Sequence, residues 1–176
     1  KANVPDPAEF VRKAREHRLG ELLHNPQILN LLVEAIGGNE WPQSRKEIYE
    51  MACHQLVNEE SRAHRDARRE KHHPPETLLD AAGYLCAIHL LSGITGFALD
   101  EDASDDQHYY WNGLTAHDLP LFLALKTNLF QKDGEEQRTP VHRSVAEYLG
   151  ARYLAARIEN GGLPFGRILA LMTGED

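Results

Sequence analysis

Cysteine is scarce in this chain of 176 residues, which contains only Cys53 and Cys86. Both cysteines fall on the apolar faces of predicted helices, so buried free thiols are favoured over a disulfide. Such sparing use of cysteine is typical of a reducing compartment, and we therefore expect a cytoplasmic protein.

Long hydrophobic runs are also missing. The longest apolar segments, ILNLLVEAI at 28–36 and LCAIHLLSGI at 85–94, are shorter than the roughly 20 residues that a membrane-spanning helix needs. The chain contains no stretch that resembles a signal peptide. We therefore expect no association with a membrane.

The common signatures of nucleotide-binding and hydrolytic sites are absent. The sequence contains no GxxxxGK[ST], no GxGxxG, no HExxH and no GxSxG. The chain accordingly has no phosphate-binding loop of its own. We expect it neither to be an enzyme by itself nor to hold a cofactor by itself.

An excess of positive charge is lacking as well, because 19 basic residues face 27 acidic ones and the formal net charge is −8. This balance argues against binding to nucleic acid. The basic run RAHRDARREKHH at 62–73 includes Asp66 and Glu70 within helical pairing distance of its cations. The segment TAHDLPLFLAL at 115–125, which would form a recognition helix, is apolar, whereas base readout needs Arg, Lys, Asn or Gln.

Ten histidines raise the question of a metal site. The two best clusters are His72 and His73 with His64, and His117 and Asp118 with His108. Adjacent histidines point in different directions on a helix, and no CxxC or HxxxH pair accompanies them. Solvated histidines are therefore the favoured interpretation, and we expect no metal.

Helical periodicity and capping signals predict a mainly α fold. Ser44 with Glu47, and Ser144 with Glu147, have the spacing of a capping box at a helix start. Helices are expected at 6–23, 24–38, 41–61, 75–93, 114–125 with Thr115 as the N-cap, 144–158 and 163–172.

One β-hairpin is expected at 128–142, where NLFQKDGEEQRTPVH contains a turn at 132–135. The acidic segment 94–113 is interpreted as a surface loop with at most one short strand. A short helix, a hairpin and a long helix follow one another in an order close to that of a winged helix. An all-helical domain, in which the hairpin is a loop, remains an alternative.

The domain prediction has three parts. Residues 1–65 form a helical subdomain, 75–160 a winged-helix-like subdomain, and 161–176 the start of a further helical region. The boundary between the first two falls within 61–76. Self-association through the apolar segment 163–172 is a further expectation.

The segment TPVHRSVAEYLGARYLAARI, residues 139–158, places His142 just ahead of a predicted helix. The N-terminus of a helix favours anions, so an imidazole at this point can contact a phosphate. The plainer alternative is that His142 packs or forms a hydrogen bond where the loop meets the helix. Pro26 suits the first turn of the helix predicted at 24–38.

These segments together resemble one family. DPAEFVRKAREHRLGELLHNPQILNLLVEAI at 6–36, followed by WPQSRKEIYEMACHQLV at 41–57, resembles the helical lid that follows the ATPase core in NACHT-type STAND NTPases. VHRSVAEYLGARYLA at 141–155 is similar to the histidine-containing segment of that family's winged-helix domain. Gly150 stands where the family usually has alanine.

The resemblance implies a P-loop ATPase core upstream of Lys1 as the main partner, with ATP or ADP as the cofactor of the whole protein. The lid and the winged helix would close over ADP. Pro26 would pack near the adenine, and His142 would contact the β-phosphate. Exchange of ADP for ATP would then release the protein for oligomerisation and signalling.

A second interpretation needs no nucleotide. The chain would then be a stand-alone winged-helix regulator that binds another protein or DNA. It predicts a gene with no ATPase core upstream of this region.

Overall fold

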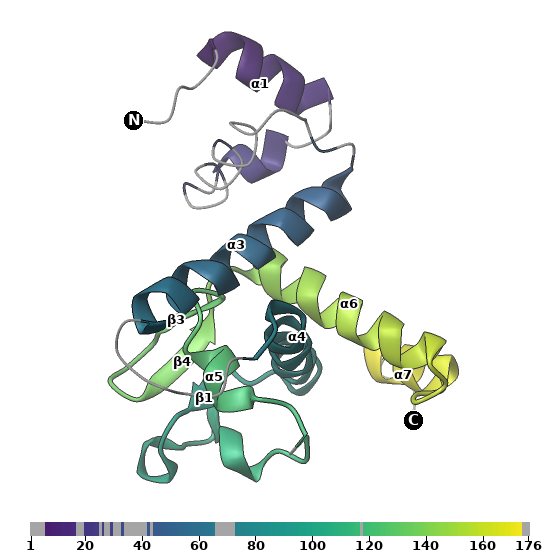
Figure 1. The fold of residues 1–176 in the computed structure, drawn as a ribbon. Coiled ribbons are helices and arrows are strands. Elements are labelled where there is room, and N and C mark those ends of the chain that lie inside the picture. Colours follow the sequence, from purple (N-terminus) through teal and green to yellow (C-terminus); the bar gives the residue numbers. More distant parts are fainter. Residues whose placement is uncertain are drawn as a thin grey trace. The chain divides into compact units, whose positions relative to one another are not determined.

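The computed structural model describes residues 6–16, 20–24, 26, 29, 33, 42, 44–65, 73–116 and 118–173 (Figure 1). The chain divides into two compact units, Lys1–Gln55 and Leu56–Asp176. The described part is mainly helical and carries one small four-stranded sheet, which confirms the mainly α fold class. The subdomain limits 1–65, 75–160 and 161–176 stay predictions.

The first unit begins with helix α1, Pro7–Glu16. The Asp6 carboxylate accepts a hydrogen bond from the Ala8 backbone N–H at 3.0 Å, which caps the helix. The prediction of one helix as far as residue 23 is wrong, because Gly20–His24 forms a separate 3-10 helix, η1. Glycine is a weak helix former, which is consistent with a break here. Most of the helix predicted at 24–38 lies outside the described residues, although Pro26, Leu29 and Val33 are helical.

Helix α3, Arg45–Arg65, contains the division between the two units. The Glu47 N–H donates to Ser44 Oγ at 3.2 Å, so the predicted Ser44 cap is confirmed. One apolar face of this helix is buried, and its members are Ile48, Tyr49, Ala52, Cys53, Leu56 and Val57. Residues 66–72 of the basic run lie outside the described residues.

The second unit is built on helices α4, Pro75–Ser92, and α6, Arg143–Glu159. These two helices share the most extensive contact of any pair of elements that the structure describes. Gly83 of α4 faces Leu149 and Tyr153 of α6, and Gly150 of α6 faces Ala87 of α4. Glycine at position 150 thus has a packing reason, since a side chain there would press on α4.

The sheet contains β1, Gly96–Ala98; β2, His108–Tyr110; β3, Phe130–Lys132; and β4, Gln137–Pro140. The strand order is β2-β1-β4-β3. β1 pairs with β2 in parallel and with β4 in antiparallel orientation, and β3 pairs with β4 in antiparallel orientation. The predicted hairpin is therefore confirmed, and the all-helical alternative is wrong.

The interpretation of 94–113 as a surface loop is wrong. This segment supplies two strands and two short 3-10 helices, η2 at Glu101–Ala103 and η3 at Trp111–Gly113. β1 is buried throughout because it has a paired strand on each side. A central strand of three residues is too short to produce a recognisable alternation in the sequence.

Helix α5, Leu121–Leu125, precedes the hairpin. The predicted Thr115 cap is wrong: Pro120 occupies the N-cap position, and no side chain caps this helix. Thr115 instead lies near α4, with its hydroxyl 3.5 Å from the Tyr84 hydroxyl. α5, β3, β4 and α6 follow one another in the expected winged-helix-like order (Figure 1).

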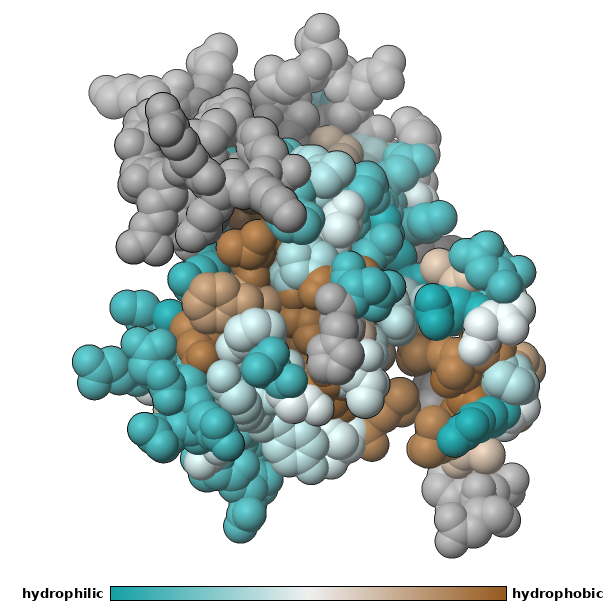
Figure 2. Space-filling model, turned by 60° about the horizontal axis from the view of Figure 1, so that its bottom comes forward, coloured by the Kyte–Doolittle hydropathy of each residue, from teal (hydrophilic) through white to brown (hydrophobic). Residues whose placement is uncertain are grey.

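Helix α7, Phe165–Thr173, follows a turn in which Gly161 has a φ of 69°. Its Phe165, Leu169 and Leu171 are exposed, and Figure 2 shows a hydrophobic area where this helix lies. Cys53 and Cys86 are both buried, as predicted. Among the helices of the described ranges, none is long and apolar enough to cross a membrane.

Candidate functional site

The N-terminus of α6 is formed by His142 itself. His142 has an extended backbone, and its ring Nδ1 accepts a hydrogen bond from the Ser144 N–H at 3.2 Å. The Ser144 hydroxyl lies 2.7 Å from the same nitrogen. The predicted Ser144 cap is therefore wrong, because the cap lies two residues earlier in the chain.

The hairpin explains this displacement. The Val141 N–H still bonds to the Leu129 carbonyl at 2.9 Å, so the chain leaves the hairpin only at this residue. The His142 carbonyl then accepts bonds from the N–H groups of Val145 and Ala146, which are the first bonds of the helix. Ser144 thus already lies in the first turn, where its own N–H needs an acceptor.

The predicted capping role of Glu147 is wrong for the same reason. Glu147 lies one turn into the helix, and its carboxylate accepts from Arg143 Nε at 2.8 Å. The Arg143 side chain is 84% exposed, so this is a surface ion pair of small energetic weight. Arg143 also places a cationic group next to His142 in the chain, and the sequence motifs did not single it out.

The hydrogen bonding at His142 determines its tautomer. A backbone N–H can only donate, so Nδ1 accepts and the neutral ring carries its proton on Nε2. His142 is exposed at the helix N-terminus. An Nε2–H donor beside the positive end of a 17-residue helix is suited to contact an anion.

Pro26, the other predicted nucleotide contact, is helical and exposed. It belongs to the unit Lys1–Gln55, whereas His142 belongs to Leu56–Asp176. An exposed proline ring offers an apolar surface for a base. Its assignment to the adenine stays a prediction from the family resemblance.

Replacing His142 with alanine should destabilise the chain by about 1 kcal/mol, because the Ser144 N–H loses its acceptor. Replacing His142 with serine should restore most of that loss, since serine is an effective N-cap. Urea unfolding followed by circular dichroism measures both variants. Equal destabilisation by alanine and serine would mean that the ring packs rather than caps.

The segment predicted as a recognition helix is poorly suited to reading DNA. Leu121, Ala124 and Leu125 are buried, and α5 contains no polar residue. The ammonium of Lys126, just after the helix, lies 3.9 Å from the centre of the Phe122 ring. This cation is already engaged in a cation–π contact.

The histidine clusters considered for a metal are only partly described. His72, His117 and the side chain of His64 lie outside the described residues. Within the ranges that are described, no group of three or more His, Cys, Asp or Glu side chains is arranged to hold a metal ion. His108 instead lies between the carboxylates of Asp105 and Asp133. Of these two contacts, the sequence could have revealed only the one with Asp105, because this residue lies three positions earlier in the chain.

No protein-family model, curated protein or solved structure matches this chain. The resemblance to the NACHT-type STAND NTPases therefore rests on the motifs at 6–36, 41–57 and 141–155. A role for His142 therefore has to follow from its hydrogen bonds and its exposure at the helix N-terminus.

Proposed function

We propose that this chain is the lid and winged-helix part of a NACHT-type STAND NTPase, which closes over ADP held by a P-loop core on the same polypeptide. The observation that carries the proposal is the position of His142. Its Nδ1 is bound to the Ser144 N–H, which leaves Nε2 as the donor of a residue that is exposed at the N-terminus of α6. A plain packing role does not require this residue to be exposed.

The chemistry fits a diphosphate. The imidazole N–H donates a hydrogen bond, the helix dipole contributes partial positive charge, and Arg143, which is exposed and paired with Glu147, adds a cation next to His142 in the chain. His142 would contact the β-phosphate and Pro26 would pack near the adenine. The chain itself performs no catalysis, and ATP or ADP is a ligand of the complete protein.

The proposed mechanism is a switch between two states of a cytoplasmic signalling protein. A ligand shifts such an equilibrium only by binding one state more tightly than the other. The contact between His142 and ADP stabilises the closed state. Exchange of ADP for ATP removes this stabilisation of the closed state, and the opened protein oligomerises.

The proposal predicts faster ADP release from the full-length protein when His142 is replaced by either alanine or serine. Losing one hydrogen bond to a charged group, worth about 1.5–3 kcal/mol, corresponds to release that is roughly 10- to 100-fold faster. Displacement of a fluorescent ADP analogue measures the rate. Chromatography of the extracted nucleotide measures how much ADP the purified protein retains.

The serine variant separates the two roles of His142, because it keeps the helix cap and lacks the Nε2–H donor. Ser44→Ala is the matched control, since it removes a similar cap from α3 without touching His142. If the serine variant retained ADP as well as the wild type does, His142 would be a structural cap only. A gene with no GxxxxGK[ST] motif upstream of this region would overturn the whole proposal.

A further inference from the structure

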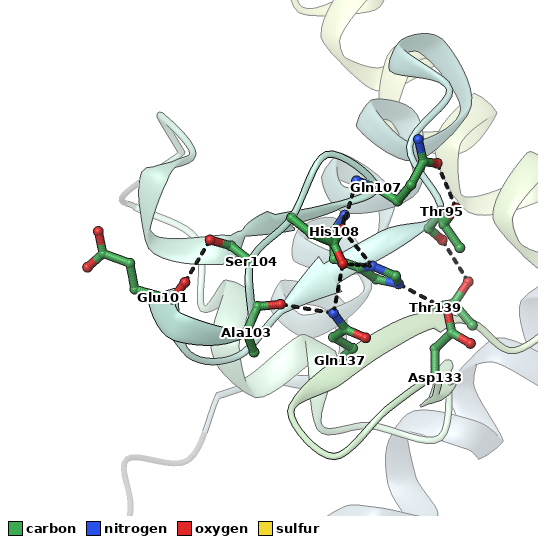
Figure 3. A network of polar contacts seen from close by, with 10 residues as sticks. Thr95, Glu101, Ala103, Ser104, Gln107, His108, Asp133, Gln137 and Thr139 are labelled. Carbon is green, nitrogen blue, oxygen red and sulfur yellow. Dashed lines mark hydrogen bonds and ion pairs between the residues drawn. The ribbon is translucent and has the colours of Figure 1, made fainter.

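A buried histidine joins two loops at the far end of the hairpin from His142 (Figure 3). His108 is 8% exposed. Its Nδ1 lies 3.0 Å from Asp105 Oδ1, and its Nε2 lies 3.0 Å from Asp133 Oδ2. Asp105 belongs to the connection between η2 and β2, and Asp133 is the first residue of the turn between β3 and β4.

The two ring–carboxylate contacts require two donors on the ring, although Asp105 also accepts from the Gln107 and His108 backbone N–H groups. An ionised carboxylate only accepts hydrogen bonds, so each ring nitrogen of His108 must carry a proton to satisfy both partners. A neutral imidazole has one N–H and can satisfy one of them. The geometry therefore selects the imidazolium, with both bonds charge-assisted.

The charges around His108 also favour the protonated imidazole. Burial lowers the pKa of His108, but its hydrogen bonds to Asp133 and Asp105 and the charges of these two groups outweigh burial and raise the pKa above 6.5. The pKa of Asp105 is lowered, mainly by the Gln107 backbone N–H and, against some desolvation, by its contacts with His108. Asp105 therefore stays ionised wherever His108 titrates.

In the described part of the chain, strands β1 and β4 also contribute groups near the ring. From β1, Gly96 lies against the ring carbon Cδ2. From β4, the Arg138 guanidinium donates to the Gln137 and Glu135 carbonyls. The remaining acidic groups of the two loops add negative charge and are exposed: Asp100, Glu101, Asp102, Asp106, Glu135 and Glu136.

Three further hydrogen bonds join the same region and depend on the two loops being held together. Gln137 Nε2 donates to the Ala103 carbonyl at 2.9 Å and to Asp105 Oδ2 at 3.2 Å. The Leu99 N–H donates to the Glu136 carbonyl at 2.8 Å. The Leu99 amide therefore reports directly on whether the turn is docked.

We propose that His108 is a protonation-dependent latch that holds the hairpin turn, residues 133–136, against the connection formed by residues 99–107. This device goes beyond the proposed nucleotide contact and does not depend on it. When His108 loses a proton, one carboxylate faces a ring lone pair instead of a donor. That bond is lost, and the turn separates from the connection more often.

The direction of the pH effect follows from the raised pKa of His108. Below about pH 6.5 the imidazole is protonated in both the folded and the unfolded chain, so the latch contributes its full stabilisation. As the pH rises through the folded pKa, which lies above 6.5, this contribution is lost. Opening of the turn is therefore a response to alkaline conditions.

The test combines two nuclear magnetic resonance measurements on the chain. The His108 ring signal, assigned by its loss in His108→Gln, is followed from pH 5.5 to 9. Hydrogen exchange of the Leu99 amide is divided by that of the Val141 amide, which bonds to Leu129 at the other end of the hairpin. The ratio removes the common dependence of exchange on pH.

We expect His108 to titrate above pH 6.5 and relative Leu99 exchange to rise by about tenfold across that titration, which corresponds to the loss of one hydrogen bond between charged groups. Asp133→Asn should lower the midpoint and abolish the rise. Glu135→Gln, which removes a charge from the same turn without a bond to His108, should preserve both. A wild-type ratio that stays constant while His108 titrates, or a midpoint at or below 6.5, would overturn the latch even if a variant failed to fold.

Discussion

Gly96→Ala should cost about 3 kcal/mol or more of the free energy of unfolding and should disrupt the sheet. A Cβ at Gly96 would overlap the Arg138 carbonyl oxygen and would come within 3.1 Å of the His108 ring. β1 has a paired strand on each side, and Phe97 and Ala98 are fully buried, so the strand cannot move aside. Thermal and urea unfolding by circular dichroism measure the loss.

The matched control is Gly113→Ala, because a Cβ at Gly113 meets no atom within 4 Å. This variant should stay within about 0.5 kcal/mol of the wild type, as surface substitutions usually do. Equal stability of the two variants would mean that β1 does not approach β4 as closely as the structure indicates. Since domains are stable by only about 5–15 kcal/mol, the Gly96 variant should be visibly compromised.

Gly83→Ala should destabilise the packing of α4 against α6. A Cβ at Gly83 would lie 2.8 Å from Tyr153 Cβ and 2.9 Å from the Leu149 carbonyl oxygen. Alanine is intrinsically better in a helix by about 0.5–1 kcal/mol, but overpacking against a backbone atom costs about 1–3 kcal/mol. Overpacking is the larger effect, so we expect a net loss of about 1–2 kcal/mol in urea unfolding.

Gly166→Ala is the control for this second prediction, since it makes the same replacement in α7 with no atom within 4 Å of the new Cβ. Helix propensity then acts alone, and the stability should be unchanged or rise by up to about 1 kcal/mol. A gain in stability for Gly83→Ala as well would show that the two helices can separate at no cost.

Local signals in the sequence were sufficient for several elements. Ser44 followed by Glu47 marked the start of α3, and Gly93, with a φ of 72°, ends α4 where the pattern predicted. The hairpin was recognisable because its turn residues lie between two short strands that are close in sequence. Each of these features depends on residues within a few positions of one another.

The candidate site was foreseen only in part. The sequence placed His142 at the mouth of a helix, but it assigned the cap to Ser144. The N–H of Val141 remains bonded to Leu129, and this hairpin contact moves the helix start so that the imidazole becomes the cap. The residues of the predicted helix alone do not reveal this contact, because Leu129 lies on the other side of the hairpin.

The sequence by itself determined the helical class, the hairpin, the burial of both cysteines and the position of His142 ahead of α6. Tertiary structure decided that Gly96–Ala98 is a central strand, that Gly83 and Gly150 face a neighbouring helix, and that His108 lies between Asp105 and Asp133. The physical reason is the range of the interactions. Capping and periodicity act within about one or two turns of the chain, whereas the partners of β1 lie between 12 and 41 positions away and the second carboxylate lies 25 positions away.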